Sequence, residues 1–559
     1  MEWEKGSLKV RLLGFWPRYE TREFNSQNKD FYGADVLVAF LQKAVSQQVS
    51  FNKGLEDEVK KAIEENNLED TIIKKLSSSV LRGHSLDGTA GLVLGIEGSK
   101  FIDPALTGLV NSRSFTTSGR RALIEDIIVP DVLNKEYNKN LREDYIRIST
   151  MALDIYKKLV ENFGEREGPQ IASKMMAYNS SGNLYIVLPI SGIISLSNEI
   201  EYQRSRGEIF FPREIEDIVD IIEKEVVKEA GMEKIYHARK LALRDSYLHS
   251  NVFKYPQENL ATDLGNLNGN PLIPLVVNHK VELTEGFLNC IRKLESMLGE
   301  TYSSKSPGEI ERLSRRNLLA FRDFIDRYND AVSLQTISSL SWRVWGEQKR
   351  HATLKQCVES IYMAAERAYD IVRNLPLVID EFRSKYKEFS NKDRKNFEDL
   401  LSRVERAIVV PNQLKKKGKE KLAMDYIDAS VKQIVFMETL IRNGIERRDA
   451  IYILPRNVRI RTLENYDLYN LTAGELSLRL CSTCEPERVE SSEIKEKQIK
   501  NSLPDLKNLI GPKCILGYCP ESNYCKKIFE YNKDYGKGIH DEIREILLER
   551  LHYKTGIFS

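Results

Sequence analysis

The feature that most constrains the fold is a short segment that occurs once in each half of the chain. Leu184-Tyr-Ile-Val-Leu-Pro189 resembles Ile451-Tyr-Ile-Leu-Pro455. Each is an apolar run that predicts a short strand, and each ends at a proline, which cannot donate a hydrogen bond to a sheet. An arginine-bearing segment follows each of them, at residues 203–206 and 478–481. The sequence therefore predicts a tandem repeat of one α/β (α+β) design, in which each copy has a small sheet flanked by long helices.

The length of the chain agrees with two such copies. Its 559 residues exceed one ordinary domain and suit two large ones with a tail. Residues 250–256 restart the pattern after a long amphipathic helix, so we place the boundary between the copies there. We expect an N-terminal repeat at 1–249, a C-terminal repeat at 250–480 and a cysteine-rich tail at 481–559.

The charge balance bears on partners and location. The formal net charge is only +2 although 30% of the residues are charged, so no global basic field favours nucleic acid. The first residues form no signal peptide, and the most apolar run, 184–196, is too short to span a bilayer. We expect a cytoplasmic protein without a membrane partner, with a composition compatible with heat adaptation. A nucleic-acid partner stays as an alternative that rests on local groups: Arg312, Arg315, Arg316, Arg322, the lysine-rich segment 415–421, Trp342 and Trp345.

Hydrophobic periodicity predicts the main elements. We expect strands at 8–15, 91–97, 185–188, 332–337 and 451–454. We expect amphipathic helices at 35–49, 212–231, 354–372, 397–409 and 420–442. Residues 259–274 are predicted as a loop, 415–421 as a solvated linker and 485–500 as a charged surface segment.

Residues 82–121 carry side chains that suit a phosphate-bearing ligand. Arg82-Gly-His84-Ser85 precedes the apolar run 92–96, which leads into Glu97-Gly-Ser-Lys100, and Ser118-Gly-Arg120-Arg121 follows. Guanidinium forks and small hydroxyls bind phosphate oxygens through short charge-assisted hydrogen bonds. Ser118 and Arg120 form a small anion clamp if both face one pocket. The alternative is a helix start, with Ser118 as the N-cap and the arginines in water.

Together these segments resemble the flavin-dependent thymidylate synthases, and in particular double-length members that carry two copies of the domain. That family has a Gly-His-x-Ser stretch, a strand ending Glu-Gly-x-Ser-Arg and a closing Ser-x-Arg-Tyr. In the second half, residues 342–352 look like its Gln/Arg-His-Arg core and residues 359–362 like a worn closing motif. Residues 478–481, Leu-Arg-Leu-Cys, look like its Leu-Arg-x-Cys. The resemblance covers most of the chain from about residue 75, in short islands.

The resemblance implies a reaction and a set of contacts. The substrate would be dUMP, methylated to dTMP with methylenetetrahydrofolate, FAD and NADPH, in a homo-oligomer in which a dimer of double chains mimics a tetramer. The positions that match flavin contacts are His84, Ser85, Arg350 and His351. The positions that match nucleotide contacts are Ser118, Arg120 and Gln348. No catalytic residue is assigned.

The chain also departs from the family pattern. Gly108-Leu-Val110 stands where the first copy would have Arg-His-Arg, and Ala352 replaces the last arginine in the second copy. Tyr185 and Ile451 stand where the family has an arginine before its Leu-Pro strand. One reading is a composite site to which both halves contribute. The alternative is a catalytically inactive scaffold that serves as a binding or structural protein for a nucleotide or nucleic acid.

Five of the seven cysteines lie in the last eighty residues: Cys481, Cys484, Cys514, Cys519 and Cys525. Four thiolates in a tetrahedron suit structural Zn²⁺. The looser spacing of the last three leaves disulfides as an equal alternative.

Overall fold

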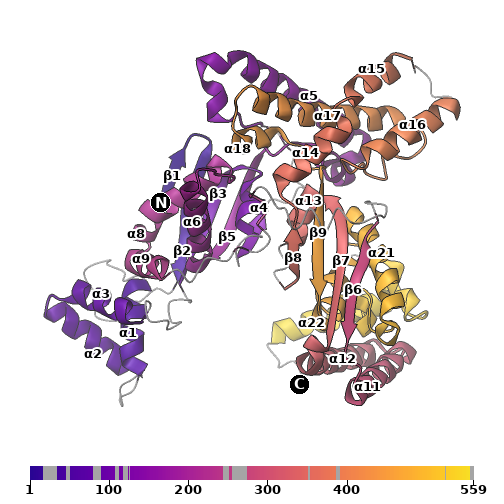
Figure 1. Cartoon of the computed structure of the whole chain (residues 1–559). Coiled ribbons are helices and arrows are strands. Elements are labelled where there is room, and N and C mark those ends of the chain that lie inside the picture. Colours follow the sequence, from indigo (N-terminus) through magenta and orange to yellow (C-terminus); the bar gives the residue numbers. More distant parts are fainter. Residues whose placement is uncertain are drawn as a thin grey trace. The chain divides into compact units, whose positions relative to one another are not determined.

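The computed structural model describes residues 1–16, 34–45, 51–79, 90–107, 112–116, 124, 126–242, 248, 251–254, 273–349, 353–385, 391–522 and 524–553. The chain divides into two compact units (Figure 1). Unit 1 comprises Met1–Gln257, Ser341–Arg350 and Ser360–Arg459, and unit 2 comprises Glu258–Leu340, His351–Glu359 and Ile460–Ser559. Unit 1 thus contains segments from both halves of the sequence. A compact unit and a sequence repeat are different divisions, so the tandem repeat stays a prediction.

Unit 1 is built on a five-stranded antiparallel sheet in the order β1-β2-β3-β5-β4. The strands are β1 (Glu2–Lys5), β2 (Leu8–Trp16), β3 (Gly91–Ser99), β4 (Arg113–Thr116) and β5 (Ser181–Pro189). Leu94 of β3 faces Ile186 of β5 in the register, and both side chains are fully buried. Alternate residues of a strand point to one face, so this pattern gives the sheet its buried side. The strands predicted at 8–15, 91–97 and 185–188 are confirmed.

Helices make up the rest of unit 1. Those of the first half are α1 (Ala34–Val45), α2 (Phe51–Glu64), α3 (Leu68–Ser79), α4 (Ile102–Thr107), α5 (Lys139–Ala172), α6 (Ile190–Ser205), α7 (Arg213–Ile221), α8 (Val227–Glu229) and α9 (Glu233–Leu241). Those of the second half are α13 (Trp342–Gln348), α14 (Ile361–Val372), α15 (Leu375–Lys385), α16 (Asn391–Val404), α17 (Glu420–Arg442) and α18 (Arg447–Ala450). The long helices α5 and α17 pack against each other, which ties the two parts of the sequence into one core.

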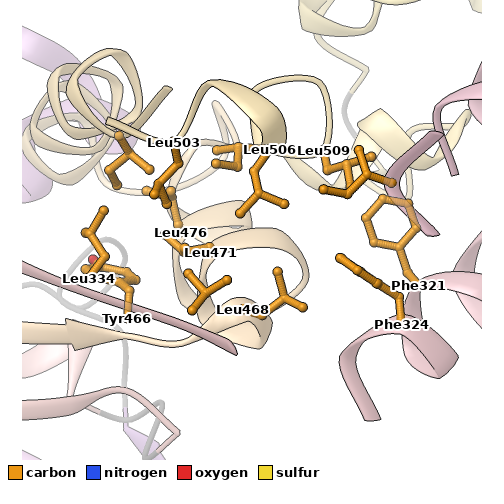
Figure 2. Packing of buried hydrophobic residues seen from close by; sticks show 14 of the residues in the cluster. Phe321, Phe324, Leu334, Tyr466, Leu468, Leu471, Leu476, Leu503, Leu506 and Leu509 are labelled. Carbon is orange, nitrogen blue, oxygen red and sulfur yellow. The ribbon is translucent and has the colours of Figure 1, made fainter. Parts of the chain in front are cut away.

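Unit 2 has a four-stranded sheet in the order β6-β7-β9-β8. The strands are β6 (Leu275–Val281), β7 (Val332–Ser341), β8 (Lys355–Val358) and β9 (Arg459–Tyr466), and the helices are α11 (Glu285–Ser303), α12 (Pro307–Tyr328), α19 (Leu468–Thr472), α20 (Glu475–Arg479), α21 (Pro486–Ser502) and α22 (Lys537–Tyr553). Leucines of α19, α20 and the segment after α21 pack with Leu334, Phe321 and Phe324 in one apolar core, shown in Figure 2. The mixed helix-and-sheet fold class with two small sheets is therefore confirmed.

Three predicted elements differ from the structure in type, bounds or burial, and the helix predicted at 397–409 is also shifted, because α16 begins at Asn391 and ends at Val404. Residues 451–454 are not a strand: Ile451–Ile453 form a 3-10 helix that continues directly from α18, because a short apolar run alone does not distinguish strand from helix. The helix predicted at 354–372 begins only at Ile361. Strand β8 precedes it, and the Ser360 hydroxyl accepts a hydrogen bond from the Tyr362 N–H to cap the helix.

The third difference is the charged segment 485–500, which forms α21 and buries Arg488 and Lys495. The predicted linker 415–421 is an ordered turn that leads into α17, and Lys415 pairs there with Glu405. Most of the predicted loop 259–274 lies outside the described residues. No helix among the described residues has the length and apolar character needed to cross a membrane.

Candidate anion-binding site

The structure describes only some of the predicted site residues. His84, Ser85, Ser118, Arg120, Arg350 and His351 lie outside the described residues, so their roles stay predictions. Gln348 is described and is fully buried at the end of α13 in unit 1. Lys100, which ends the Glu97-Gly-Ser-Lys100 segment, is also described and provides the starting point for the site.

The turn after β3 fixes the position of Lys100. The Lys100 backbone N–H donates to the carbonyls of Tyr178 and Ser180 at 3.1 and 3.0 Å. Ser99 donates from its N–H to Oε1 of Glu214 at 2.7 Å and from its hydroxyl to Oε2 of the same carboxyl group. A Cβ on Gly98 would collide with Glu214, so only glycine allows this approach. The segment therefore holds a buried glutamic acid on one side and presents Lys100 on the other.

Burial has a direct effect on this carboxyl group. It raises the pKa of Glu214 to about 7, against the opposing effect of the two hydrogen bonds from Ser99. Glu214 therefore stabilises the turn by accepting the two hydrogen bonds from Ser99. Its protonated form is accessible near neutral pH.

The side chain of Lys100 is partly buried and lies over Gly182, with Nζ 3.2 Å from the place where a Cβ on that glycine would be. Among the described residues it has no hydrogen-bond or ion-pair partner. The pKa of Lys100 is lowered to about 8, chiefly by burial and also by the neighbouring guanidiniums of Arg456 and Arg343, against the attraction of Asp103. The Lys100 ammonium therefore lies close to two other positive charges, those of Arg456 and Arg343.

Arg343 and Arg456 come from the second half of the sequence and are linked through their backbones. The Arg343 N–H donates to the Arg456 carbonyl at 2.9 Å. The Arg456 guanidinium donates to the carbonyls of Met176 and Ser173 at 3.2 and 2.8 Å. Burial and the charge of Arg343 lower the pKa of Arg456 to about 10.

Lys349 adds a fourth cation at the end of α13. Its Nζ donates to the carbonyls of Asp103, at 3.3 Å, and Pro104, and it lies 5.0 Å from the centre of the Trp345 ring. Only 5% of Lys349 is exposed. Among the described residues, the carboxylates that accompany the four cations are Asp103 and Glu347, which pairs with Arg343 at 3.4 Å. Within the described part of the chain, the cluster therefore has more cations than carboxylates.

Aromatic rings line the same region. Phe101 stacks on Tyr178 with ring centres 4.2 Å apart, and Tyr178 meets the edge of Trp342 at 5.7 Å. Trp342 in turn lies 5.0 Å from Trp345. These rings are buried and pack against one another, so they form an apolar wall of the core beside the cations.

Arg343, Lys349 and Arg456 are not among the site residues predicted from the sequence. Lys349 and Arg343 lie within the segment 342–352 that resembles the family core, and Arg456 directly follows Pro455 of the repeated motif. For Arg456 the available signal was its place directly after the buried run 451–455, because such a residue starts from the core rather than from the surface.

The cysteine-rich tail does not present the expected metal centre. All seven cysteines are free thiols, so the disulfide alternative is not present in this structure. Within the described ranges, no group of three or more His, Cys, Asp or Glu side chains is arranged to hold a metal ion. The expected zinc site at Cys481, Cys484, Cys514, Cys519 and Cys525 is therefore unsupported.

Comparisons with known proteins give distant likenesses. No protein-family model matches the chain, and no curated protein sequence matches it. The UMP/dUMP methylase PolB from Streptomyces cacaoi, bound with 5-Br dUMP, is 11% identical with a TM-score of 0.28, over 42% of this chain and 97% of that one. The flavin-dependent thymidylate synthase ThyX from Helicobacter pylori, complexed with FAD and dUMP, is 12% identical with a TM-score of 0.25, over 43% of this chain and 98% of that one. These TM-scores are too low to establish a shared fold.

Proposed function

We propose that unit 1 binds a phosphate-bearing nucleotide, and that the chain is a flavin-dependent thymidylate synthase-like protein that takes dUMP together with FAD. The observation that carries the proposal is Lys100, a partly buried ammonium without a hydrogen-bond or ion-pair partner among the described residues, beside Arg343 and Arg456. A buried cation is costly unless it is paired. The negative charge of a bound phosphate group would pair with these cations.

The residues fit a phosphate better than a neutral ligand. Guanidinium and ammonium groups bind phosphate oxygens through charge-assisted hydrogen bonds, and Lys100, Arg343 and Arg456 would share this role. His84, Ser85, Arg350 and His351 remain the expected FAD contacts. Ser118, Arg120 and Gln348 remain the expected nucleotide contacts.

The proposed reaction is the methylation of dUMP to dTMP. Bound FAD would supply hydride chemistry, with methylenetetrahydrofolate as the carbon source and NADPH as the reductant. The part of this chain's own residues is to bind and orient the nucleotide in a region from which aromatic rings exclude water.

The first test is the affinity for dUMP compared with that for deoxyuridine, measured by calorimetry on the full chain. We expect dUMP to bind more tightly, because only dUMP carries the phosphate. Replacing Lys100 with Met should weaken dUMP binding by about 10- to 100-fold, since a hydrogen bond to a charged group contributes about 1.5–3 kcal/mol. Lys157→Met, an exposed lysine on α5, is the matched control and should leave the affinity unchanged.

The pH dependence adds an independent check. Because the pKa of Lys100 is lowered to about 8, the ammonium loses its proton above that pH. The affinity of the free protein for dUMP should therefore decline above about pH 8, and Lys100→Met should lack this decline. Equal binding of dUMP and deoxyuridine by the unchanged protein would contradict the proposal.

Turnover separates the active form of the proposal from the inactive one. The full chain is supplied with dUMP, FAD, methylenetetrahydrofolate and NADPH, and dTMP is measured. Formation of dTMP supports the composite-site reading, in which both halves supply contacts. Binding of dUMP without dTMP supports the alternative, a nucleotide-binding protein that has lost the reaction, which the replacement of Arg-His-Arg by Gly108-Leu-Val110 favours.

A further inference from the structure

One face of the five-stranded sheet of unit 1 is covered by helices. Even-numbered residues of β3 and β5, such as Leu94 and Ile186, are buried on this face. A Cβ on Gly98 of β3 would collide with Glu214 of α7, so α7 lies over the same face. Helices α4 and α6 also contact β3 and β5 (Figure 1). Successive residues of a strand point to opposite faces, so the odd-numbered residues of β3 and β5 form a second face, which we call the open face.

Apolar side chains form a patch on the open face. The Trp16 ring lies over Gly91, where a Cβ would collide with it. Carbon atoms of Leu13 and Tyr185 lie 3.5 and 3.6 Å from the position of a Cβ on Gly95. Leu13 is 46% exposed and Tyr185 is 56% exposed. The patch consists of Leu13, Trp16, Val93, Tyr185 and Val187, and none of these side chains is buried. Water therefore reaches an apolar surface that extends over β2, β3 and β5.

Charged residues border the patch on β2 and β3. Arg11 lies opposite Gly95 in the register, and Lys9 lies opposite Glu97, so all three charged side chains belong to the open face. Lys9 pairs with Glu4 at 3.0 Å. Among the described residues, neither Arg11 nor Glu97 has an ion-pair partner, and both are exposed. Within the described part of the chain, the open face therefore carries an unpaired cation and an unpaired carboxylate on neighbouring strands.

This distribution of charge fits a second copy of the chain better than a nucleic acid. Glu2 and Glu4 of β1 lie on the same face as Glu97, so the open face has no excess of positive charge to attract phosphates. In a two-fold pair the same surface meets itself, so an unpaired group finds its partner only if that surface also carries the opposite charge. Arg11 and Glu97 meet this condition.

A two-fold axis that runs along the strands between β2 and β3 satisfies both requirements. It places β2 of one copy on β3 of the other, as in two sheets that pack face to face about 10 Å apart. Leu13 then lies on the partner's Val93. Arg11 lies opposite the partner's Gly95, and the partner's Glu97 is two residues, or about 7 Å, farther along the strand, within reach of the long arginine side chain. Each contact occurs twice.

The size of the face sets the expected affinity. Strands β2, β3 and β5 have nine residues each, so they cover about 30 by 15 Å on each copy. With the flanking strands, the area buried on both copies is about 1,000 Å², which is close to the lower limit for a specific interface. We therefore expect a dimer with a Kd in the micromolar range.

We propose that the open face of the unit 1 sheet is the interface of a homodimer of this chain. The apolar patch around Leu13 and Tyr185 forms its centre, and two reciprocal ion pairs between Arg11 and the partner's Glu97 lie at its border. The proposal concerns assembly and does not rest on nucleotide binding, so each proposal can fail without the other.

Sedimentation velocity of the full chain without nucleotide, from about 0.1 to about 100 μM, measures the association. We expect a monomer at the low end and a dimer at the high end. Tyr185→Glu places a carboxylate in the apolar patch and should weaken the dimer at least about tenfold. Tyr202→Glu, at a 55% exposed tyrosine of α6, is the matched control and should leave the dimer unchanged. A chain that stays monomeric over the whole range would overturn the proposal, and binding of a short single-stranded RNA that is lost in Tyr185→Glu would then assign the open face to nucleic acid.

Charge reversal tests the contact between the copies. Arg11→Glu and Glu97→Arg should each weaken the dimer at least about tenfold, because like charges then meet twice. An equimolar mixture of the two variants should associate again, because both contacts of the mixed pair join opposite charges. Both residues are exposed, and circular dichroism confirms that each variant is folded. Dimers that persist in Tyr185→Glu and in both charge variants would show that the chain associates through another surface, and a mixture that stays monomeric would overturn the proposed pairing.

Discussion

Glu464 of β9 is the point where removing one charge should have the largest effect on unit 2. Its carboxylate is fully buried and accepts hydrogen bonds from Thr336, Ser338 and Tyr466 at 3.0, 3.2 and 3.1 Å. It forms ion pairs with Lys495 and, at 3.5 Å, with Arg488. Both cations lie on α21 with 1% of their side chains exposed. Glu464 therefore neutralises charges that cannot reach water.

Replacing Glu464 with Gln keeps the shape and the hydrogen-bond acceptor but removes the negative charge. Among the described residues, Lys495 then has no counter-charge in direct contact, and Arg488 retains Glu475 at 3.6 Å. Breaking a buried ion pair by removing one partner costs about 3–5 kcal/mol. A loss of about 4 kcal/mol corresponds to about a thousandfold increase in the population of the opened unit. A double variant that also carries Lys495→Met should recover part of this loss, because it removes the uncompensated cation.

Hydrogen exchange of peptides from β9 and α21 measures this opening locally. All four tryptophans lie in unit 1, so tryptophan fluorescence during urea unfolding reports on unit 1. Its unfolding midpoint should not change in Glu464→Gln, which alters unit 2. Glu282→Gln, which removes a carboxylate from an exposed ion pair with Lys280, is the control and should leave exchange unaltered. Exchange within about tenfold of the unchanged protein for Glu464→Gln would refute the reasoning.

Two further predictions concern unit 1. The pKa of Glu214 is raised from 4.5 to about 7, so the folded state holds the proton more tightly and its stabilising contribution is lost as the pH rises through 7. The free energy of unfolding, measured by urea titration with tryptophan fluorescence, should decrease by up to about 3 kcal/mol as the pH rises from 5 to 8. Glu214→Gln should flatten this dependence. Gly98→Ala should destabilise unit 1 in the same assay because the new Cβ collides with Glu214 and Ile102, and a stability equal to that of the unchanged protein would contradict this account.

The sequence predicted elements whose hydrophobic pattern is set by burial on one side. The strands at β2, β3, β5 and β7 alternate or form short apolar runs, and α17 occupies the predicted residues 420–442. The prediction was wrong where charge was taken as a sign of exposure. In α21, Arg488 and Lys495 are seven residues apart on one face of the helix and turn inward toward Glu464. The local sequence of α21 does not show that the carboxylate of Glu464, on strand β9, will neutralise these two cations.

The same limit applies to the candidate site. Lys100 was within the segment that suggested phosphate binding, because its glycine and serine neighbours form a recognisable motif. Arg456 and Lys349 were missed, because their place beside Lys100 and Asp103 depends on how segments of the second half pack into unit 1. Such long-range packing leaves no periodic signal in the sequence.

The two buried charge clusters differ in a way that separates structural charges from ligand-binding ones. In unit 2, Glu464 and Glu475 lie in ion-pair contact with the buried cations, whereas in unit 1 Lys100 has no such contact with a described residue. Lys100→Met should therefore stabilise ligand-free unit 1, by up to about 3 kcal/mol for a lysine pKa lowered from 10.5 to about 8, while it weakens dUMP binding. Urea unfolding followed by tryptophan fluorescence, with and without dUMP, measures both effects. A Lys100→Met protein that is less stable and binds dUMP normally would identify Lys100 as a structural residue, because only a charge kept for a ligand trades stability for binding.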